Sequence, residues 1–378
     1  MNKRKFKKAN IEVYPLGFGA MRLPLLDVAD NGSINEAEAT KMIRHAIDSG
    51  LNYIDTAVPY HSQKGEDFVG KVLQDGYREK VYLTTKLPCW QIKEAKEFNS
   101  IFKKQLKRLQ VDYVDIYLLH SMQKKNWKKV KDLGVLDFLD TIKAQGKAKN
   151  IGFSFHDNFE VFKDIVDSYD WDVCQIQFNY FDTNAKEFLD YASDKGIDVI
   201  VMEPLRGGGL VNDLPKEITD LFKSTAIKRN PAEWAFRWLY NYENVKLILS
   251  GMSNMEQVKD NLRIFNEAKA NSMTKEEMDI MDKAAQIFKD RILVPCTSCQ
   301  YCMPCPYGVK IPTLFENYNT YSMLGNSQKY IDTYRNWKNK KEDRFTADVC
   351  VGCRLCETKC PQSIIISERM IDIERVMG

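Results

Sequence analysis

Residues 52–57 read NYIDTA and residues 81–86 read VYLTTK, and these two runs are the clearest of a series of short, mostly apolar segments. The others are Leu16–Met21, Asp115–His120, Asn150–Ser154, Val173–Gln177, Asp198–Met202 and Lys246–Ser250. Most of these segments show little polar alternation, which is typical of strands buried on both faces of a parallel sheet. The chain is therefore expected to contain eight parallel strands.

Amphipathic segments lie between these strands and predict helices. Asn35–Gly50 begins with an Asn that can cap a helix and ends on Gly, and the others are Glu94–Leu109, Val130–Gly146, Asn158–Asp167, Ala185–Gly196 and Met255–Ala268. The alternation predicts an α/β fold, a (β/α)8 TIM barrel, with an open doubly wound sheet as the alternative. The glycine motif of a dinucleotide-binding open sheet is incomplete here, because Gly17-Phe18-Gly19 lacks the third Gly, and the barrel is therefore favoured.

The composition excludes several classes of protein. The 378 residues carry a net charge of only +3, which gives no reason to expect nucleic acid or an anionic membrane as a partner. The basic start MNKRKFKKANIEVYP has no apolar stretch of a signal peptide, and no run approaches the ~18 apolar residues that cross a bilayer. We therefore expect a cytoplasmic chain with reduced thiols, whose grouped cysteines bind metal.

Four reactive side chains lie at the predicted carboxyl ends of strands, where barrels of this kind place their active sites. Asp55 and Tyr60 follow the second strand, Lys86 ends the third and His120 ends the fourth. Each alone has an ordinary structural explanation, but together they can catalyse a reaction. We expect Asp55 to hold the Lys86 ammonium, and that cation to lower the pKa of Tyr60. His120 then orients a substrate carbonyl, and Tyr60 protonates its oxygen as hydride arrives at carbon.

These residues resemble a known family. DTAVPY at 55–60, TTKLP around Lys86 and LLHS around His120 are similar to the signatures of the aldo-keto reductases. The resemblance covers about residues 10–290. It implies a barrel that binds NADP or NAD without a Rossmann fold and reduces a small-molecule carbonyl, an aldehyde or ketone.

The same resemblance implies the residues that hold the nicotinamide end of the cofactor. The first-strand loop corresponds to Gly19, Ala20, Met21 and Arg22, and Asp55 is also counted among the cofactor-binding residues. Ser154 and Gln175 match the side chains that hold the carboxamide; the family often has Asn directly after this Ser, and His156 could replace it here. Met202 occupies the position that packs against the nicotinamide face.

The resemblance also extends to the phosphate and adenosine ends. A loop that can embrace phosphates is formed by Glu203, Leu205, Arg206, Gly207 and Gly208. The adenosine end corresponds to Gly251, Gln257, Asp260 and Asn261. Relatives specific for NADPH carry Lys and Arg at the places of Gly251 and Gln257, so NADH use is credible, although Lys259 lies nearby. The choice between NADPH and NADH therefore stays open.

The cysteines are unevenly placed: two lie in the first 295 residues and eight in the last 83. The eight form C-x2-C-x2-C-x2-C-P and C-x2-C-x2-C-x3-C-P, of which the second is the bacterial ferredoxin pattern. By the crossed ligation of two-cluster ferredoxins, one 4Fe–4S cluster is held by Cys296, Cys299, Cys302 and Cys360, and the other by Cys350, Cys353, Cys356 and Cys305. Two four-thiolate zinc sites are the alternative.

The chain is thus predicted to have two domains, an aldo-keto reductase-like barrel at 1–290 and an α-rich ferredoxin-like domain at 291–378 with a helical insert at about 311–340. It resembles the ferredoxin-tailed branch of the family. Hydride carries two electrons and a 4Fe–4S cluster passes one, so three functions stay open. In the first, the clusters serve a reductase by exchanging electrons with ferredoxin or another carrier. In the second, they are structural or redox-sensing and the reductase works without them. In the third, the protein is mainly an electron-transfer module whose barrel binds a partner or cofactor without carbonyl turnover.

Overall fold

The structure is a computed structural model that describes residues 3–27, 30–212, 214–296, 300–325, 327–340 and 345–378. The chain divides into two compact units. We call residues 1–207 and 232–274 the barrel unit, and residues 208–231 and 275–378 the tail unit. Among the described residues, no helix has the length and apolar character needed to cross a membrane.

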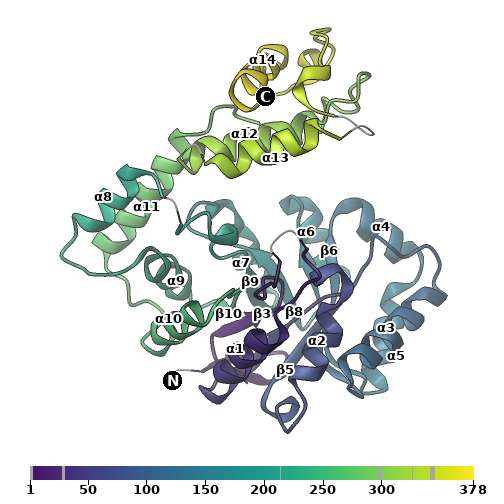
Figure 1. Cartoon of the computed structure of the whole chain (residues 1–378). Helices are drawn as coiled ribbons and strands as arrows, with labels where there is room; N and C mark the ends of the chain where they lie inside the picture. The colour runs from purple at the N-terminus through teal and green to yellow at the C-terminus, as the bar shows by residue number, and fades with distance from the viewer. Residues whose placement is uncertain (1–2, 28–29, 213, 297–299, 326, 341–344) are drawn as a thin grey trace. The chain divides into compact units, whose positions relative to one another are not determined.

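Eight parallel strands form a closed barrel in the barrel unit (Figure 1). They are β3 (Leu16–Gly19), β4 (Tyr53–Asp55), β5 (Tyr82–Leu87), β6 (Val114–Met122), β7 (Ala148–Phe155), β8 (Val173–Gln177), β9 (Asp198–Met202) and β10 (Val245–Ser250). The barrel closes where β10 pairs with β3, with Ser250 opposite Phe18. The predicted strands and the (β/α)8 barrel are confirmed.

Helices follow the strands around the barrel. They are α1 (Glu36–Asp48), α2 (Gly65–Val72), α3 (Lys96–Leu109), α4 (Lys124–Asp132), α5 (Val135–Ala144), α6 (Phe159–Asp167), α7 (Lys186–Asp194), α9 (Pro231–Asn241) and α10 (Met255–Asn266). Asn35 caps α1 as predicted, because its side chain accepts a hydrogen bond from the Glu38 amide. The prediction of one helix over Val130–Gly146 is wrong. Gly134 lies between α4 and α5 with φ of 80°, a left-handed conformation that ends the first helix.

A hairpin closes the amino-terminal end of the barrel. Strand β1 (Arg4–Phe6) pairs antiparallel with β2 (Ile11–Val13). Phe6 and Val13 are fully buried, and they pack in one cluster with inward-facing barrel residues such as Tyr53 and Leu247. This end is therefore filled with apolar side chains, and the polar groups collect at the other end of the strands.

The tail unit is helical. It contains α8 (Lys216–Lys223), α11 (Lys275–Asp290), α12 (Ile311–Met323), α13 (Gln328–Lys338) and α14 (Ile366–Met377). The last three helices share a core that includes Leu314, Tyr334 and Ile373, and several cysteines pack against it. The limits of 1–290 and 291–378 stay a prediction. The compact units differ from them, because α8 and α11 pack on each other in the tail unit.

Short 3-10 helices complete the chain in both units. They are η1 (Tyr60–Gln63), η2 (Arg78–Lys80), η3 (Thr183–Ala185), η4 (Arg206–Gly208), η5 (Ala347–Val349) and η6 (Glu357–Lys359). Of these, η1 carries Tyr60, and the last two lie beside the second cysteine group.

Candidate functional site

The four predicted catalytic residues come together at the carboxyl end of the barrel. Asp55 is the last residue of β4, Tyr60 begins η1, and Lys86 and His120 lie near the ends of β5 and β6. Since β4, β5 and β6 are neighbours in register, residues far apart in the sequence become adjacent at this end. The sequence order of the four residues thus follows their order around the barrel.

Lys86 is the centre of this arrangement. Its Nζ atom donates to Asp55 Oδ1 at 2.6 Å, to the Thr56 carbonyl at 3.1 Å and to the Tyr60 hydroxyl at 3.2 Å. The Lys86 and Asp55 side chains are only 1% and 3% exposed. A buried ion pair of this kind needs additional hydrogen bonds, and Gln175 supplies one by donating from Nε2 to Asp55 Oδ2 at 3.1 Å.

His120 stands beside Tyr60. The centroids of the Tyr60 and His120 rings are 6.3 Å apart, and the two rings are nearly perpendicular. The Trp90 ring also contacts His120 in an edge-to-face arrangement, with the ring centroids 5.0 Å apart. The Nδ1 atom of His120 is buried and has no hydrogen-bond partner among the described residues. A buried polar atom without a partner is uncommon, and it fits a place where a polar ligand binds.

Burial controls the acid–base properties of the four residues. Burial raises the pKa of Tyr60, and the nearby Lys86 ammonium offsets only part of that effect. The expected net lowering of the Tyr60 pKa is therefore wrong, because desolvation outweighs the cation. Burial also works against the charged form of Lys86, but Asp55 and Tyr60 outweigh it and the Lys86 pKa is raised. Burial, and then Lys86, hold the pKa of His120 well below its ordinary value.

The two side chains predicted to hold a carboxamide are buried near this group. Ser154 lies in β7 and its Oγ accepts a hydrogen bond from the Ser121 amide at 2.8 Å. Gln175 lies in β8 and contacts Asp55. His156 follows β7, and it has a side-chain hydrogen bond with Gln177. The sequence did not indicate the direct contact between Gln175 and Asp55.

Arg22 connects three of the predicted cofactor segments. Its carbonyl accepts from Ser253 Oγ at 3.0 Å. A Cβ placed on Gly207 would lie 2.6 Å from Arg22 Nη2, and one placed on Gly251 would lie 3.2 Å from Arg22 Cβ. Both glycines thus leave room for Arg22, and Gly207 also has a left-handed φ of 67°. A cation with donor groups between glycine-rich backbone segments fits an anionic group such as a pyrophosphate.

The remaining loop residues have varied surroundings. Gly19 ends β3, the Ala20 amide donates to the Asp55 carbonyl at 2.8 Å, and Met21 is exposed. Met202 packs against the inner barrel cluster. The other residues of this set are Glu203, which is exposed, Leu205, which is half-buried, and Arg206, whose guanidinium lies 5.1 Å from the Phe181 ring. Arg206 is thus engaged with an aromatic ring. Gly208, with φ of 95°, belongs to the tail unit.

The predicted adenosine end is held by hydrogen bonds at the start of α10. Gln257 Oε1 accepts from the Ser253 amide at 2.8 Å, and Asn261 Nδ2 donates to Ser250 Oγ at 3.0 Å. Asp260 forms an ion pair with Arg263 at 2.8 Å. Arg263 is therefore already paired with a carboxylate at this end.

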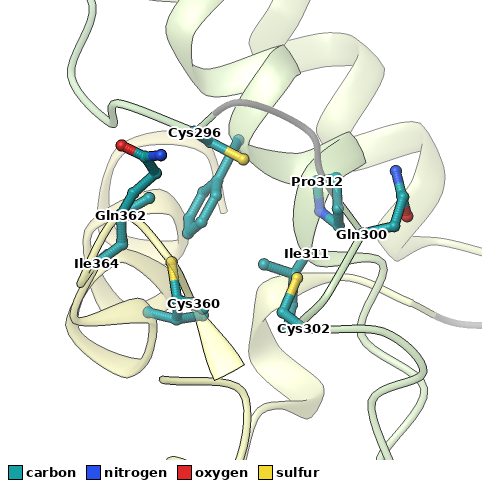
Figure 2. Close-up of a pocket in the computed structure, with 10 residues that line it drawn as sticks. Cys296, Gln300, Cys302, Ile311, Pro312, Cys360, Gln362 and Ile364 are labelled. Carbon is teal, nitrogen blue, oxygen red and sulfur yellow. The ribbon is translucent and has the colours of Figure 1, made fainter. Parts of the chain in front are cut away.

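Three of the four cysteines predicted for one cluster line a single pocket of the tail unit. Figure 2 shows Cys296, Cys302 and Cys360 around it, with Ile311 and Ile364 among the apolar residues of the wall. Cys299 lies outside the described residues. Asn319 of α12 fixes the start of this segment, because its side chain both accepts from the Val294 amide at 2.9 Å and donates to the Val294 carbonyl at 2.7 Å. The first and second cysteine groups thus meet in one pocket.

The second predicted set also lies together. Cys350 and Cys305 are close enough to Cys356 to act electrostatically on it, although burial is the main reason that the Cys356 pKa is raised to about 11. Cys353 is exposed. Tyr334 positions this segment by accepting from the Ala347 amide at 3.0 Å and donating to Glu374 at 2.6 Å. The placement of Cys305 fits the crossed ligation pattern.

The cysteine spacing can be compared with the needs of each metal. A structural zinc ion draws four ligands to within ~2.3 Å of one point. Among the described residues, no three His, Cys, Asp or Glu side chains converge in this way. In a four-iron cluster, each thiolate binds a different iron, so the ligands surround a larger group. The iron and zinc content of the purified protein distinguishes these two kinds of site.

The buried Lys86–Asp55 pair gives a stability prediction. Lys86→Met should lower the free energy of unfolding of the barrel unit by about 3 kcal/mol, because Asp55 is left buried without its cation. Fluorescence can follow this transition, since five of the six tryptophans lie at or before residue 238. In Asp55→Asn/Lys86→Met the carboxylate is gone, and the loss should be smaller than the sum of the two single losses. Additive losses would contradict the coupling.

Comparison with known families covers both units. A profile of the aldo/keto reductase family matches residues 15–286, and a profile of the 4Fe-4S dicluster domain matches residues 295–365. Among known proteins, the glyoxal reductase of Bacillus subtilis is 29% identical over 256 residues, which span 66% of this chain and 84% of that protein.

Two solved structures resemble the barrel. The holo form of aldo-keto reductase AKR11C1 from Bacillus halodurans has a TM-score of 0.64 at 26% identity, over 75% of this chain and 96% of that chain. An aldo-keto reductase from Klebsiella pneumoniae in complex with NADPH has a TM-score of 0.62 at 22% identity, over 75% and 95% of the two chains. The latter likeness concerns the fold.

Proposed function

Because this chain belongs to the aldo/keto reductase family and carries a 4Fe-4S dicluster domain, we propose that it reduces an aldehyde or ketone with NADPH or NADH, with Tyr60 as the general acid. The observation that carries the proposal is the position of Lys86 Nζ, 2.6 Å from Asp55 and 3.2 Å from the Tyr60 hydroxyl. A catalytic barrel needs this connected group, whereas a barrel that only binds a partner does not.

The chain's own residues divide the chemistry between them. The nicotinamide, when bound, supplies the hydride. The Tyr60 hydroxyl gives its proton to the substrate oxygen, on which negative charge develops, and the Lys86 ammonium stabilises the phenolate that remains. Asp55 keeps Lys86 in place, and neutral His120 donates a hydrogen bond that orients the carbonyl. Ser154 and Gln175 are proposed to hold the carboxamide, and Arg22 with Gly207 the phosphates.

We assign the clusters to the crossed cysteine sets. The first four-iron cluster takes Cys296, Cys299, Cys302 and Cys360, and the second takes Cys305, Cys350, Cys353 and Cys356. When bound, such clusters pass one electron at a time. We propose that they exchange electrons with an outside carrier such as ferredoxin, in the cytoplasm, where the thiols stay reduced.

A second candidate function is supported by the tail unit. Hydride transfer does not itself need one-electron groups, so the protein could be an electron-transfer or redox-sensing iron–sulfur protein whose barrel binds a cofactor or partner without carbonyl turnover. The cysteines favour this candidate and the tetrad opposes it. The two functions make opposite predictions for nicotinamide oxidation by purified protein.

The test is anaerobic purification followed by an assay of NADPH and NADH oxidation with aldehydes, ketones and quinones. The relative named above is a glyoxal reductase, so small dicarbonyl compounds belong in the first set. Turnover with a carbonyl substrate would support the reductase. Cluster reduction by a chemical donor without carbonyl turnover would support the electron-transfer protein.

The pH dependence of reduction should follow the two shifted groups. The Tyr60 pKa lies above its ordinary value of 10.0, so this general acid stays protonated from pH 6.5 to about 9. The His120 pKa lies below its ordinary value of 6.5, so the ring stays neutral over the same range. We expect kcat for reduction to be nearly constant over this range and to fall only above about pH 10. A tenfold change in kcat between pH 6.5 and 8.5 would contradict this assignment.

A further inference from the structure

His61, the residue directly after Tyr60, is buried among backbone groups of a distant loop. Only 1% of the surface of this residue is exposed. Its Nε2 atom lies 3.1 Å from the Ala20 carbonyl and 3.3 Å from the Leu23 amide, while Nδ1 lies 3.0 Å from the Asn31 carbonyl. One imidazole ring therefore contacts both ends of the segment that follows β3.

Either neutral form of the ring bonds to the segment from Ala20 to Leu23. With the proton on Nε2, the ring donates to the Ala20 carbonyl. With the proton on Nδ1, it donates to Asn31 and accepts from the Leu23 amide. Burial lowers the pKa of His61, which favours these neutral forms. The contact to the first-strand loop is therefore kept in both tautomers.

The backbone around His61 is strained. The φ angles are 51° at His61, 53° at Ser62 and 70° at Gln63, and residues other than glycine rarely adopt such values. Such residues carry a conformational cost, and the conformation persists only where its surroundings fix it. This backbone conformation turns the His61 side chain inward, while Ser62 and Gln63 stay exposed. Lys64 adds a second connection, because its Nζ donates to the Gly32 carbonyl at 3.1 Å.

Ala20 is held from two sides. Its amide donates to the Asp55 carbonyl at 2.8 Å, and its carbonyl faces His61 Nε2. The backbone from Gly19 to Arg22 is thereby fixed between Asp55 and the residue next to Tyr60. Two members of the tetrad are thus connected through the loop that we propose to bind the cofactor.

We propose that His61 is a positioning residue that holds the Ala20–Leu23 loop ready for the nicotinamide cofactor and keeps Tyr60 aligned with it. This inference rests on the proposed function, because it gives the loop the role of binding the cofactor. A loop that is already ordered loses less conformational entropy on binding. Without His61, part of the binding free energy would be spent on ordering it.

Two variants of His61 distinguish the contacts made by Nε2 from the contact made by Nδ1. A Gln amide reaches the position of Nε2 and can contact Ala20 or Leu23, whereas an Asn amide reaches only the position of Nδ1, beside Asn31. In the full chain with its clusters, His61→Asn should raise the Kd of NADPH and NADH by about tenfold, the effect of losing one hydrogen bond and the order of a loop. His61→Gln should stay within about threefold of the unchanged protein.

Steady-state kinetics give a second readout. For His61→Asn, the KM for the cofactor should rise more than kcat falls, and His61→Gln should restore it. His45→Gln is the matched control, because His45 is exposed on α1, and it should leave both constants unchanged. A merely structural His61 would lower the melting temperature without this split. Wild-type Kd in His61→Asn, or equal weakening by Asn and Gln, would overturn the inference.

Hydrogen exchange keeps the test independent of folding and of the proposed function. In the unchanged protein, peptides that contain Ala20–Leu23 and His61–Lys64 should become protected together when NADPH is added. Protection of the first without the second would overturn the inference even if both variants fail to fold. If the unchanged protein binds neither NADPH nor NADH, the proposed function fails. In that case, faster exchange at Ala20–Leu23 in His61→Asn than in His61→Gln still supports the contact, and equal exchange refutes it.

Discussion

Tyr60→Phe should lower kcat for carbonyl reduction by about 10³- to 10⁴-fold, while the Kd of NADPH or NADH changes by less than about twofold. The substitution removes only the hydroxyl that Lys86 contacts at 3.2 Å, and it leaves the Asp55–Lys86 pair intact. Proton donation by the phenol to the substrate oxygen is lost, and the Lys86 ammonium, 3.2 Å from the position of that hydroxyl, and His120 are the remaining donors beside it. Pre-steady-state measurement of nicotinamide oxidation, with a separate fluorescence titration of the cofactor, distinguishes the loss of chemistry from a loss of binding.

Tyr77→Phe is the matched control for this experiment. It also removes a tyrosine hydroxyl from the barrel unit, but that hydroxyl lies on the surface and donates to Asp48 at 2.9 Å. Its kcat should be within about twofold of the unchanged protein. Substantial turnover in Tyr60→Phe would show that another group protonates the substrate, and the proposed mechanism would be wrong.

The barrel could be predicted from the sequence because its strands are buried on both faces. Segments such as Val173–Gln177 and Asp198–Met202 agree with the observed strands residue for residue. The β1–β2 hairpin was missed because each strand has only three residues, too few to show alternation. The helix α9 was also missed. It contains Trp234 and Trp238 and is buried over much of its surface, with Glu233 among its buried residues.

The tetrad could be predicted because each residue type is tied to the end of a recognisable strand. The balance of charge and burial at Tyr60 could not, since the sequence shows a cation nearby but not the desolvation that opposes it. Nor did the sequence indicate His61, because its contacts with Ala20, Leu23 and Asn31 depend on three left-handed residues in succession. Such contacts arise from the folded backbone and leave no periodic pattern.

Replacing cysteines in pairs should reveal the crossed arrangement of the clusters. The unchanged protein, purified without oxygen, should be brown and contain about eight irons per chain. Cys296→Ala should leave about four. Because Cys296 and Cys360 line one pocket, Cys296→Ala/Cys360→Ala should also leave about four, while Cys350→Ala/Cys360→Ala should leave almost none.

Ligation within each sequence motif predicts the reverse order for the two double variants, so the iron content decides between the arrangements. Cys174→Ala is the control, because Cys174 is buried in β8 of the barrel and should not change the iron content. Zinc in place of iron would contradict the cluster assignment itself.

A loss of thiolate ligands should also weaken the tail unit, since several of the eight cysteines pack against the core formed by α12, α13 and α14. Cluster binding and folding of this unit are therefore expected to be coupled, with the metal-depleted chain losing helix in its tail while its barrel still binds nucleotide.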